Sequence, residues 1–190
     1  MITSNKNKKI FYISDFSLPN MSAYTIHVLK MCDAFSESHY NVNLLLPHIR
    51  KNYKIKRIKN DYLLKSSFKI RGFFKSKINR NLLTLSLFSY RLFNFFKAYK
   101  KPHLIISRSI IPALFLSIFG QKLFLEIHTE IKGVTKFFFL ILKYFNFFNR
   151  IKFILINKNL KRILKLKKEN FIVLDDWVDC RNFKYKKKKM

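Results

Sequence analysis

Residues 104–127 read LIISRSIIPALFLSIFGQKLFLEI and contain the unit from which the fold is predicted. Two apolar runs, Leu104–Ser107 and Lys122–Ile127, flank a short apolar helical stretch at Ile110–Phe119, which Gly120 can end. Strand, helix and strand joined by such short connections are typical of a parallel βαβ unit. The two strands are continuously apolar rather than alternating, which indicates a sheet covered on both faces.

The same alternation extends in both directions from this unit. Further strands are predicted at 8–14, 42–46, 152–156 and 171–174, and further helices at 23–37, 82–100, 135–149 and 158–168. Pro47 is expected to end the second strand. We therefore predict an α/β fold with a doubly wound, mainly parallel sheet and helices on both faces. In such sheets, ligands bind beyond the carboxyl ends of the strands.

The stretch 50–80 does not follow this alternation. It carries many basic residues and a single acid, Asp61, and its hydrophobic periodicity is poor. We predict an irregular, basic surface insert with short strands. In this interpretation residues 1–180 form one domain that contains the insert, and 181–190 form a disordered basic tail.

The composition defines the classes of partner. The 190 residues include 39 Lys and Arg against 10 Asp and Glu, a formal net charge of +29. Hydrophobic residues make up 49% of the chain, which excludes a purely disordered basic protein. A positive surface attracts nucleic acid, anionic lipid headgroups and phosphorylated substrates. Lys, Ile, Phe, Asn and Tyr share A/T-rich codons, so a purely compositional origin of the charge stays open.

The expected location follows from three absences in the sequence. No stretch reaches the roughly 18 uncharged apolar residues of a spanning helix, no secretory signal is recognisable, and Cys32 and Cys180 form no disulfide framework. We expect a cytoplasmic protein, with peripheral attachment to the inner face of the membrane as an extension. The basic insert, with Phe73 and Phe74, is one candidate for an anionic membrane surface, and the helix at 158–168 is another.

Acidic residues gather where predicted strands end. Six of the ten follow strands: Asp15, Glu126, Glu130, Asp175, Asp176 and Asp179. Arg108 and His128 fall at the same edge of the sheet. Histidine exchanges protons near neutral pH, and arginine clamps phosphates. Each residue alone has a structural interpretation, such as an ion pair between Arg108 and Glu126 or Glu130; their joint placement favours a site.

Several motifs are absent from the sequence. The first strand is not followed by G-x-G-x-x-G, and the chain has no P-loop, no G-x-S-x-G elbow and no His/Cys cluster with zinc spacing. We therefore expect neither a bound cofactor nor a metal. Nucleic acid is the less favoured partner, because no RNP-like, helix-turn-helix or zinc motif is present.

Five stretches, in this order, resemble family 4 glycosyltransferases of the GT-B fold. They are SAYTIHVLKMCDAFSESHYNVNLLLP (22–47), LIISRS (104–109), KLFLEIHTE (122–130), FILINKNLKRIL (153–164) and VLDDWVDCRNF (173–183). The first is similar to that family's first helix and second strand. The next two are similar to a strand ending in Arg and a strand leading into a His-containing loop. The last is similar to the family's interdomain linker.

The resemblance implies the acceptor-side N-terminal domain of a hexosyltransferase. Such an enzyme uses a nucleotide sugar as co-substrate and a hydroxyl acceptor, such as a lipid-linked or cell-envelope glycan. The donor-binding domain is not within residues 1–190 and would come from a separate chain. A non-catalytic remnant or partner subunit, and a basic nucleic-acid-binding module, are the alternatives. The site residues implied are His128 and Glu126 as catalytic, with Arg108 and Glu126 shaping the acceptor side. The substrate-binding residues are Arg108 and Glu130, together with Asn20, Ser22 and Ala23 beside the donor phosphates.

Overall fold

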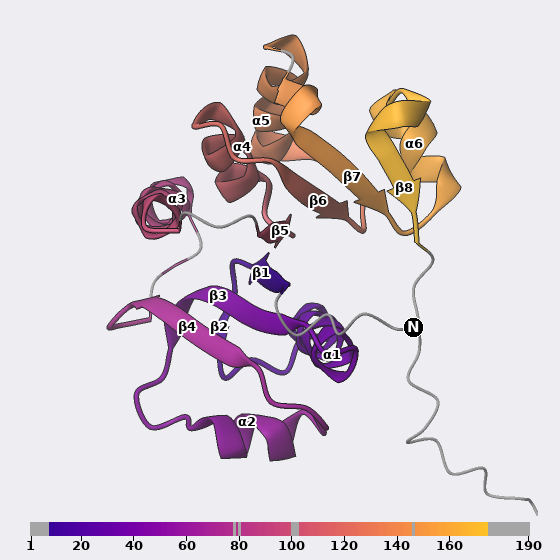
Figure 1. The fold of residues 1–190 in the computed structure, drawn as a ribbon. Coiled ribbons are helices and arrows are strands. Elements are labelled where there is room, and N and C mark those ends of the chain that lie inside the picture. Colours follow the sequence, from indigo (N-terminus) through magenta and orange to yellow (C-terminus); the bar gives the residue numbers. More distant parts are fainter. Residues whose placement is uncertain (1–7, 78, 80, 100–102, 146, 175–190) are drawn as a thin grey trace, which may run out of the picture.

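Figure 1 shows the fold in the computed structural model, which describes residues 8–77, 79, 81–99, 103–145 and 147–174. The strands are β1 Lys9–Ile13, β2 Ser17–Leu18, β3 Asn41–Ile49, β4 Lys69–Phe74, β5 Leu104–Ser107, β6 Leu123–Ile127, β7 Ile151–Leu155 and β8 Phe171–Val173. The helices are α1 Ala23–Glu37, α2 Ile55–Asp61, α3 Leu82–Lys97, α4 Ile110–Ile118, α5 Gly133–Tyr144 and α6 Lys158–Leu164, with short 3₁₀ turns η2 Phe147–Arg150 and η3 Lys168–Asn170.

One parallel sheet holds all the described strands. Its order is β2-β3-β1-β5-β6-β7-β8, and β4 also pairs with β3. Every recorded strand pair is parallel. The chain builds outward from β1 through β3 to β4, and then returns to place β5 on the other side of β1. The doubly wound α/β prediction is confirmed, and its topological switch point lies between β1 and β5.

Alternate residues of β1 enter two separate cores. Phe11 and Ile13 pack into the core that α3, α4 and α5 cover, whereas Ile10 and Tyr12 pack into the core beneath α1 and α2. This alternation follows from the period of two along a strand. Helices therefore lie on both faces of the sheet, as predicted, with α1 and α2 opposite the helices that follow β4.

The basic stretch 50–80 is more regular than predicted. It forms α2 and then β4, which pairs in parallel with β3 along the sheet. Its apolar residues explain the difference, because Tyr62 and Phe68 are buried among the lysines. Phe73 and Phe74 lie in β4 and pack, partly buried, against the core, so they present only part of their rings to solvent.

Several element ends also differ from the predictions. β3 continues past Pro47 to Ile49, because β2 and β4 both pair with His48. α5 ends at Tyr144 rather than at 149, and α6 ends where Lys165 adopts a left-handed conformation. The predicted acids Asp175, Asp176 and Asp179, together with Cys180 and the tail 181–190, lie outside the described residues.

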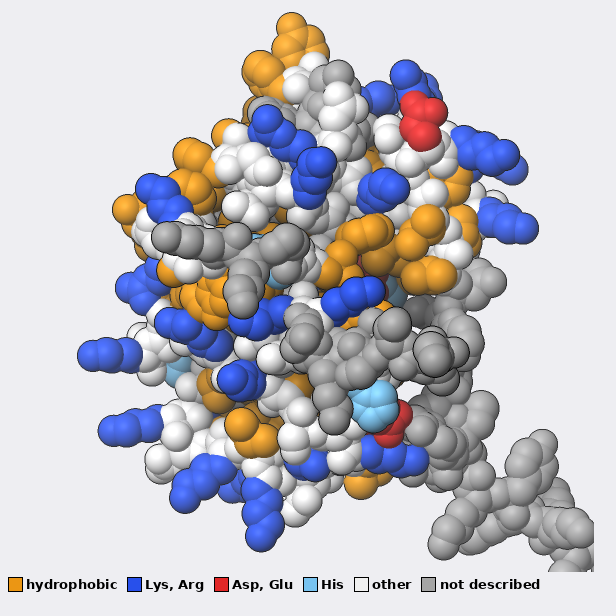
Figure 2. All heavy atoms as spheres, viewed as in Figure 1, with side chains coloured by type: hydrophobic (Ala, Val, Ile, Leu, Met, Phe, Trp, Pro, Cys, Tyr) orange, Lys and Arg blue, Asp and Glu red, His pale blue; other side chains and the backbone are white. Residues whose placement is uncertain are grey.

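Lysine and arginine side chains are spread over the face of the molecule in Figure 2, between hydrophobic patches, and few acids accompany them. Among the described residues, none of the helices combines the length and the apolar character that crossing a bilayer would require. The lysine and arginine side chains in Figure 2 show that the basic character of the sequence is found on this face of the folded protein.

Candidate functional site

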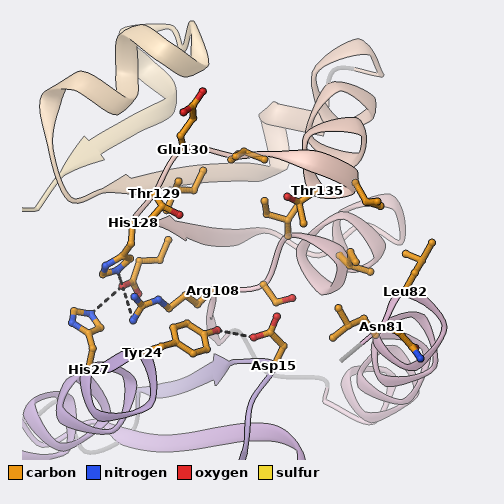
Figure 3. A pocket seen from close by; sticks show the side chains of 18 of the residues that line it. Asp15, Tyr24, His27, Asn81, Leu82, Arg108, His128, Thr129, Glu130 and Thr135 are labelled. Carbon is orange, nitrogen blue, oxygen red and sulfur yellow. Dashed lines mark hydrogen bonds and ion pairs between the residues drawn. The ribbon is translucent and has the colours of Figure 1, made fainter. Parts of the chain in front are cut away.

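A pocket of about 900 Å³ opens at the carboxyl ends of the central strands (Figure 3). The loops after β1, β5 and β6 border it, together with the first turns of α1, α3 and α5. Its charged and hydrogen-bonding side chains include Asp15, Tyr24, His27, Asn81, Arg108, Glu126, His128 and Glu130. This is the place where a doubly wound sheet binds ligands.

Strand order brings the predicted residues together. Arg108 directly follows β5, and its backbone N–H donates to the carbonyl of Ile13 at 3.0 Å, which ties the loop to β1. Glu126 lies near the end of β6, the next strand along, and His128 follows it. Arg108, Glu126 and His128 line one pocket, as predicted from their positions after adjacent strands.

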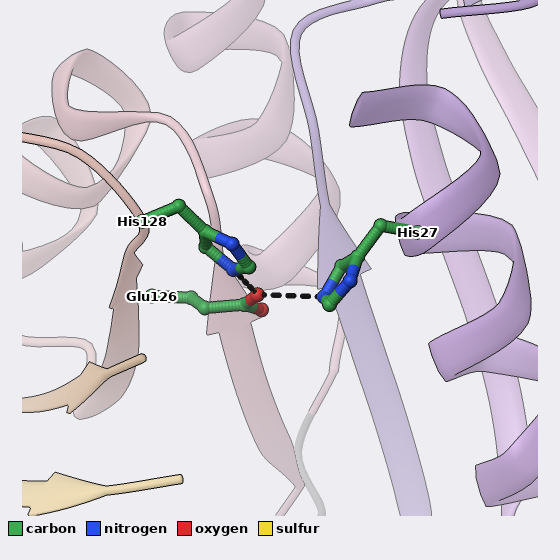
Figure 4. Close-up of side chains that lie close together, drawn as sticks. All are labelled: His27, Glu126 and His128. Carbon is green, nitrogen blue, oxygen red and sulfur yellow. Dashed lines mark hydrogen bonds and ion pairs between the residues drawn. The ribbon is translucent and has the colours of Figure 1, made fainter. Parts of the chain in front are cut away.

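Glu126 is the centre of the polar network (Figure 4). Its side chain is only 5% exposed, yet it accepts hydrogen bonds from three residues. His27 Nε2 lies 3.1 Å from Glu126 Oε1, and His128 Nε2 bonds to the same oxygen. The Tyr12 hydroxyl donates to the other carboxylate oxygen. The two imidazole rings meet edge to face, with centroids 4.6 Å apart.

The network keeps the Glu126 carboxylate charged. Burial alone would raise its pKa, but hydrogen bonds from His128, His27 and Tyr12 outweigh that effect and hold the pKa well below the usual 4.5. Burial and the neighbouring Glu126 charge raise the pKa of Tyr12, so its hydroxyl stays protonated as a donor. At neutral pH a negative charge therefore lies next to the two imidazoles.

Arg108 supplies the compensating positive charge. Its side chain is 9% exposed, and Nη1 lies 4.0 Å from Glu126 Oε1, an ion pair longer than a hydrogen bond. Nη1 is buried and makes no hydrogen bond to any described residue. The guanidinium stacks over Tyr24, with Cζ 4.5 Å from the ring centroid, and the Tyr24 hydroxyl donates to Asp15 at 2.9 Å.

Sequence reasoning missed His27 and Tyr12. His27 lies one turn after Tyr24 in α1 and next to buried Val28, so it borders the helix face that turns toward the sheet. Tyr12 is the one residue of β1 with a hydroxyl group, and its neighbours Phe11 and Ile13 are apolar and buried. A polar group in a buried strand requires a partner, and that requirement was the available signal.

Asn20 and Ser22 serve the loop before α1 rather than the pocket, since neither is among the lining residues. The Asn20 backbone N–H donates to the Tyr62 hydroxyl at 3.0 Å, and its side-chain oxygen accepts from the Ser22 N–H. Ser22 Oγ accepts from the Thr25 N–H and thereby caps α1. These groups are thus engaged within the protein itself, whereas Ala23 does line the pocket.

Glu130 lines the outer part of the pocket. Its side chain is 49% exposed and pairs with Lys132 Nζ at 3.3 Å. Such an exposed pair contributes little to stability. Glu130 is therefore accessible to a ligand, unlike the buried Glu126.

Comparisons with known proteins identify the fold. No family model matches the sequence, and no curated protein matches it. A glycosyltransferase from Rickettsia africae is similar in structure, with a TM-score of 0.59 and 10% identity over 92% of this chain and 45% of that one. A UDP-N-acetylglucosamine 2-epimerase from Rickettsia bellii is similar over 87% of this chain and 44% of its own, with a TM-score of 0.53 and 13% identity. The chain spans less than half the length of either protein. These likenesses show that the chain has a Rossmann-like α/β fold of the kind found in GT-B-type structures.

Proposed function

We propose that this chain forms the acceptor-side half of a glycosyltransferase active site. It would contribute to the transfer of a hexosyl group from a nucleotide sugar to a hydroxyl acceptor, such as a lipid-linked or cell-envelope glycan. The observation that carries the proposal is the convergence of Arg108, Glu126 and His128 in one pocket at the switch point of the sheet. The motif resemblance and the GT-B-type fold support the choice of sugar chemistry.

A hydroxyl acceptor must lose a proton as it attacks the sugar, and His128 is the proposed base. The charged Glu126 carboxylate favours the tautomer of His128 in which Nε2 carries the proton and donates to it. In that tautomer Nδ1 has the lone pair that can accept a proton. Glu126 thus orients the imidazole and stabilises the imidazolium that forms, as a carboxylate does in other base-assisted transfers.

Arg108 and Glu130 would act around this base. Arg108 partly offsets the buried Glu126 charge at 4.0 Å before the substrate binds. Glu130 lies further out and is half exposed, where a carboxylate can accept hydrogen bonds from sugar hydroxyls. Of the three residues expected beside the donor phosphates, Ala23 alone borders the pocket.

The donor half of the site belongs, in this proposal, to another domain. The chain spans 45% and 44% of the two similar structures, so a separate donor-binding domain is the implied partner. The isolated chain should then bind an acceptor without turning over a nucleotide sugar. A non-catalytic remnant would bind neither the acceptor nor the nucleotide sugar.

Ligand-observed NMR on the purified chain tests the proposal. We expect saturation transfer to simple methyl hexosides in the wild-type protein, and its loss in His128→Ala. His39→Asn is the matched control, because His39 is exposed in the turn after α1 and has a positive φ that Asn tolerates. UDP-N-acetylglucosamine serves as the donor probe, and we expect the isolated chain not to turn it over. Equal hexoside binding by His128→Ala and wild type would remove His128 from the site.

We also propose that α5 attaches the protein to an anionic membrane surface. Val134, Phe137, Leu140 and Tyr144 are each more than half exposed, and their spacing places them along one side of the helix. Exposed Lys136 and Lys143 accompany this α5 stripe, which suits a surface of anionic headgroups.

Vesicle flotation tests the attachment. The double variant Phe137→Ser/Leu140→Ser should bind phosphatidylglycerol vesicles several-fold more weakly than wild type, because it removes apolar surface while keeping every charge. Ile163→Ser, at an exposed position of the basic helix α6, is the matched control. A loss of binding confined to Ile163→Ser would move the attachment to α6.

A further inference from the structure

We propose that His27, Glu126 and His128 form a binding site for a divalent transition-metal ion at the floor of the pocket. One ligand atom from each residue lies within 4.8 Å of the other two. The three side chains converge from α1, from the end of β6 and from the loop that follows it (Figure 4). His27 is 99 residues from Glu126 in the chain, so no spacing motif could have indicated this cluster.

The three donors suit a transition metal. Two imidazoles and one carboxylate are the protein ligands of many catalytic zinc sites and of the facial triad that binds iron(II). Atoms bound to one tetrahedral ion at about 2.1 Å lie about 3.4 Å apart, so a change of about 1.5 Å or less in their separations closes the present set. Three ligands leave a coordination position for water or substrate.

The position is favourable for such an ion. Glu126 is buried, while the side chains of His27 and His128 are 23% and 13% exposed, and all three line the pocket. An ion between them would therefore be accessible to solvent and to a ligand only from the pocket. Its charge would replace the protons that now link each imidazole to Glu126.

Tyr12 completes the environment of the ligands. Its fully buried hydroxyl donates to the Glu126 oxygen that the histidines do not contact. Metal-bound carboxylates are commonly held by an outer hydrogen bond of this kind, and its loss typically weakens binding about 10–100-fold. The bond leaves Oε1 directed at both imidazoles.

The positive charge of Arg108 disfavours binding of a cation, so a substitution of Arg108 gives a specific test of the metal site. Its Nη1 lies 4.0 Å from Glu126 Oε1, so its positive charge repels a dication bound there. Arg108→Gln should consequently tighten metal binding. A site formed by scattered surface histidines would not respond in this direction.

Titration of the chelator-treated 190-residue chain with Zn²⁺ and with Co²⁺ tests the proposal. We expect calorimetry to show one high-affinity ion per chain, and Co²⁺ to give the visible absorption bands of a low-symmetry nitrogen and oxygen site. His27→Ala and His128→Ala should each lower the affinity at least about tenfold, and Tyr12→Phe about 10–100-fold. His39→Asn should retain wild-type binding.

Absence of stoichiometric uptake, or uptake unchanged in both histidine variants, would overturn the metal site. Circular dichroism checks that each variant is folded, and the histidine variants decide the question if Glu126→Gln does not fold. The inference does not rest on sugar transfer, because these readouts record metal binding alone. Hexoside binding is measured on the ion-free protein, so either proposal can fail while the other stands.

Discussion

Glu126 is a carboxylate that the protein buries without losing its charge. An unpaired buried charge costs several kcal/mol, so such a residue persists only where donors surround it. Here the donors come from β1, α1 and the loop after β6, and Arg108 lies 4.0 Å away. The charge of one side chain therefore depends on four segments of the chain, which makes it sensitive to each of them.

Tyr12→Phe tests this dependence at a single atom. The substitution removes the hydroxyl that donates to Glu126 and leaves the fully buried ring in place. We expect a loss of about 1.5–3 kcal/mol in the free energy of unfolding, measured with urea, because a buried charged acceptor loses a partner. Tyr90→Phe, on the exposed side of α3, should change it by less than about 0.5 kcal/mol. Equal effects of the two substitutions would contradict the role given to the Tyr12 hydroxyl.

Stability should also fall in acid through Glu126. Its pKa in the folded protein is well below the usual 4.5, so the unfolded chain binds a proton first as the pH falls. The stabilisation is fully present above the usual value and is lost progressively below it. Urea unfolding between about pH 5.5 and about pH 3 should show a steeper loss in wild type than in Glu126→Gln, by at most about 1.4 kcal/mol per pH unit. Parallel pH profiles would show that Glu126 titrates normally.

At the scale of elements, Asp33 joins α1 to the segment after α2. The Asp33 side chain is buried, and its two oxygens accept from the backbone N–H groups of Lys65 and Ser66 at 3.0 and 2.7 Å. Asp33→Asn keeps the shape but replaces one acceptor oxygen by an NH₂ donor. We expect a loss of about 1–3 kcal/mol in thermal or urea unfolding. Glu169→Gln, at an exposed position of η3, is the control for charge removal. An equal loss in the two variants would assign the effect to charge alone.

The pairing of β4 with β3 depends on a close approach at Gly72. A Cβ atom there would lie 3.0 Å from the Ile49 backbone nitrogen and 3.3 Å from its Cγ1. Gly72→Ala should therefore destabilise the fold by about 1 kcal/mol or more, although the same change in an open strand would stabilise it. Lys69→Ala, exposed in the same strand, should have little effect. A gain in melting temperature for Gly72→Ala would show that β3 moves aside without cost.

The elements were predictable where one periodicity dominates. The continuous apolar runs of β1, β5, β6 and β7 identified a covered parallel sheet, and the sheet order then placed Arg108, Glu126 and His128 together. The helix and strand within 50–80, α2 and β4, could not be predicted from periodicity, because the apolar residues of this stretch are spread among lysines. His27 and Tyr12 joined the site through tertiary packing of α1 on β1, which no local pattern in a single sequence encodes.

At the scale of the whole molecule, burial separates the two signs of charge. Asp15, Asp33 and Glu126 are buried, whereas no described lysine is. These three buried acids thus organise hydrogen bonds in the interior, whereas every described lysine is exposed or partly exposed to solvent. Such a surface attracts any polyanion at low salt, so attraction alone identifies no partner.

The salt dependence of binding separates a specific surface from general attraction. Binding to single-stranded DNA should fall steeply between about 50 and about 200 mM salt, because it depends on the release of counterions. Binding to phosphatidylglycerol vesicles should fall less, since the apolar contacts of the α5 stripe do not weaken with salt. The Phe137→Ser/Leu140→Ser variant should acquire the steep dependence seen with DNA, because it retains the charges alone. DNA binding that persists at physiological salt while vesicle binding is lost would instead favour a nucleic-acid-binding protein.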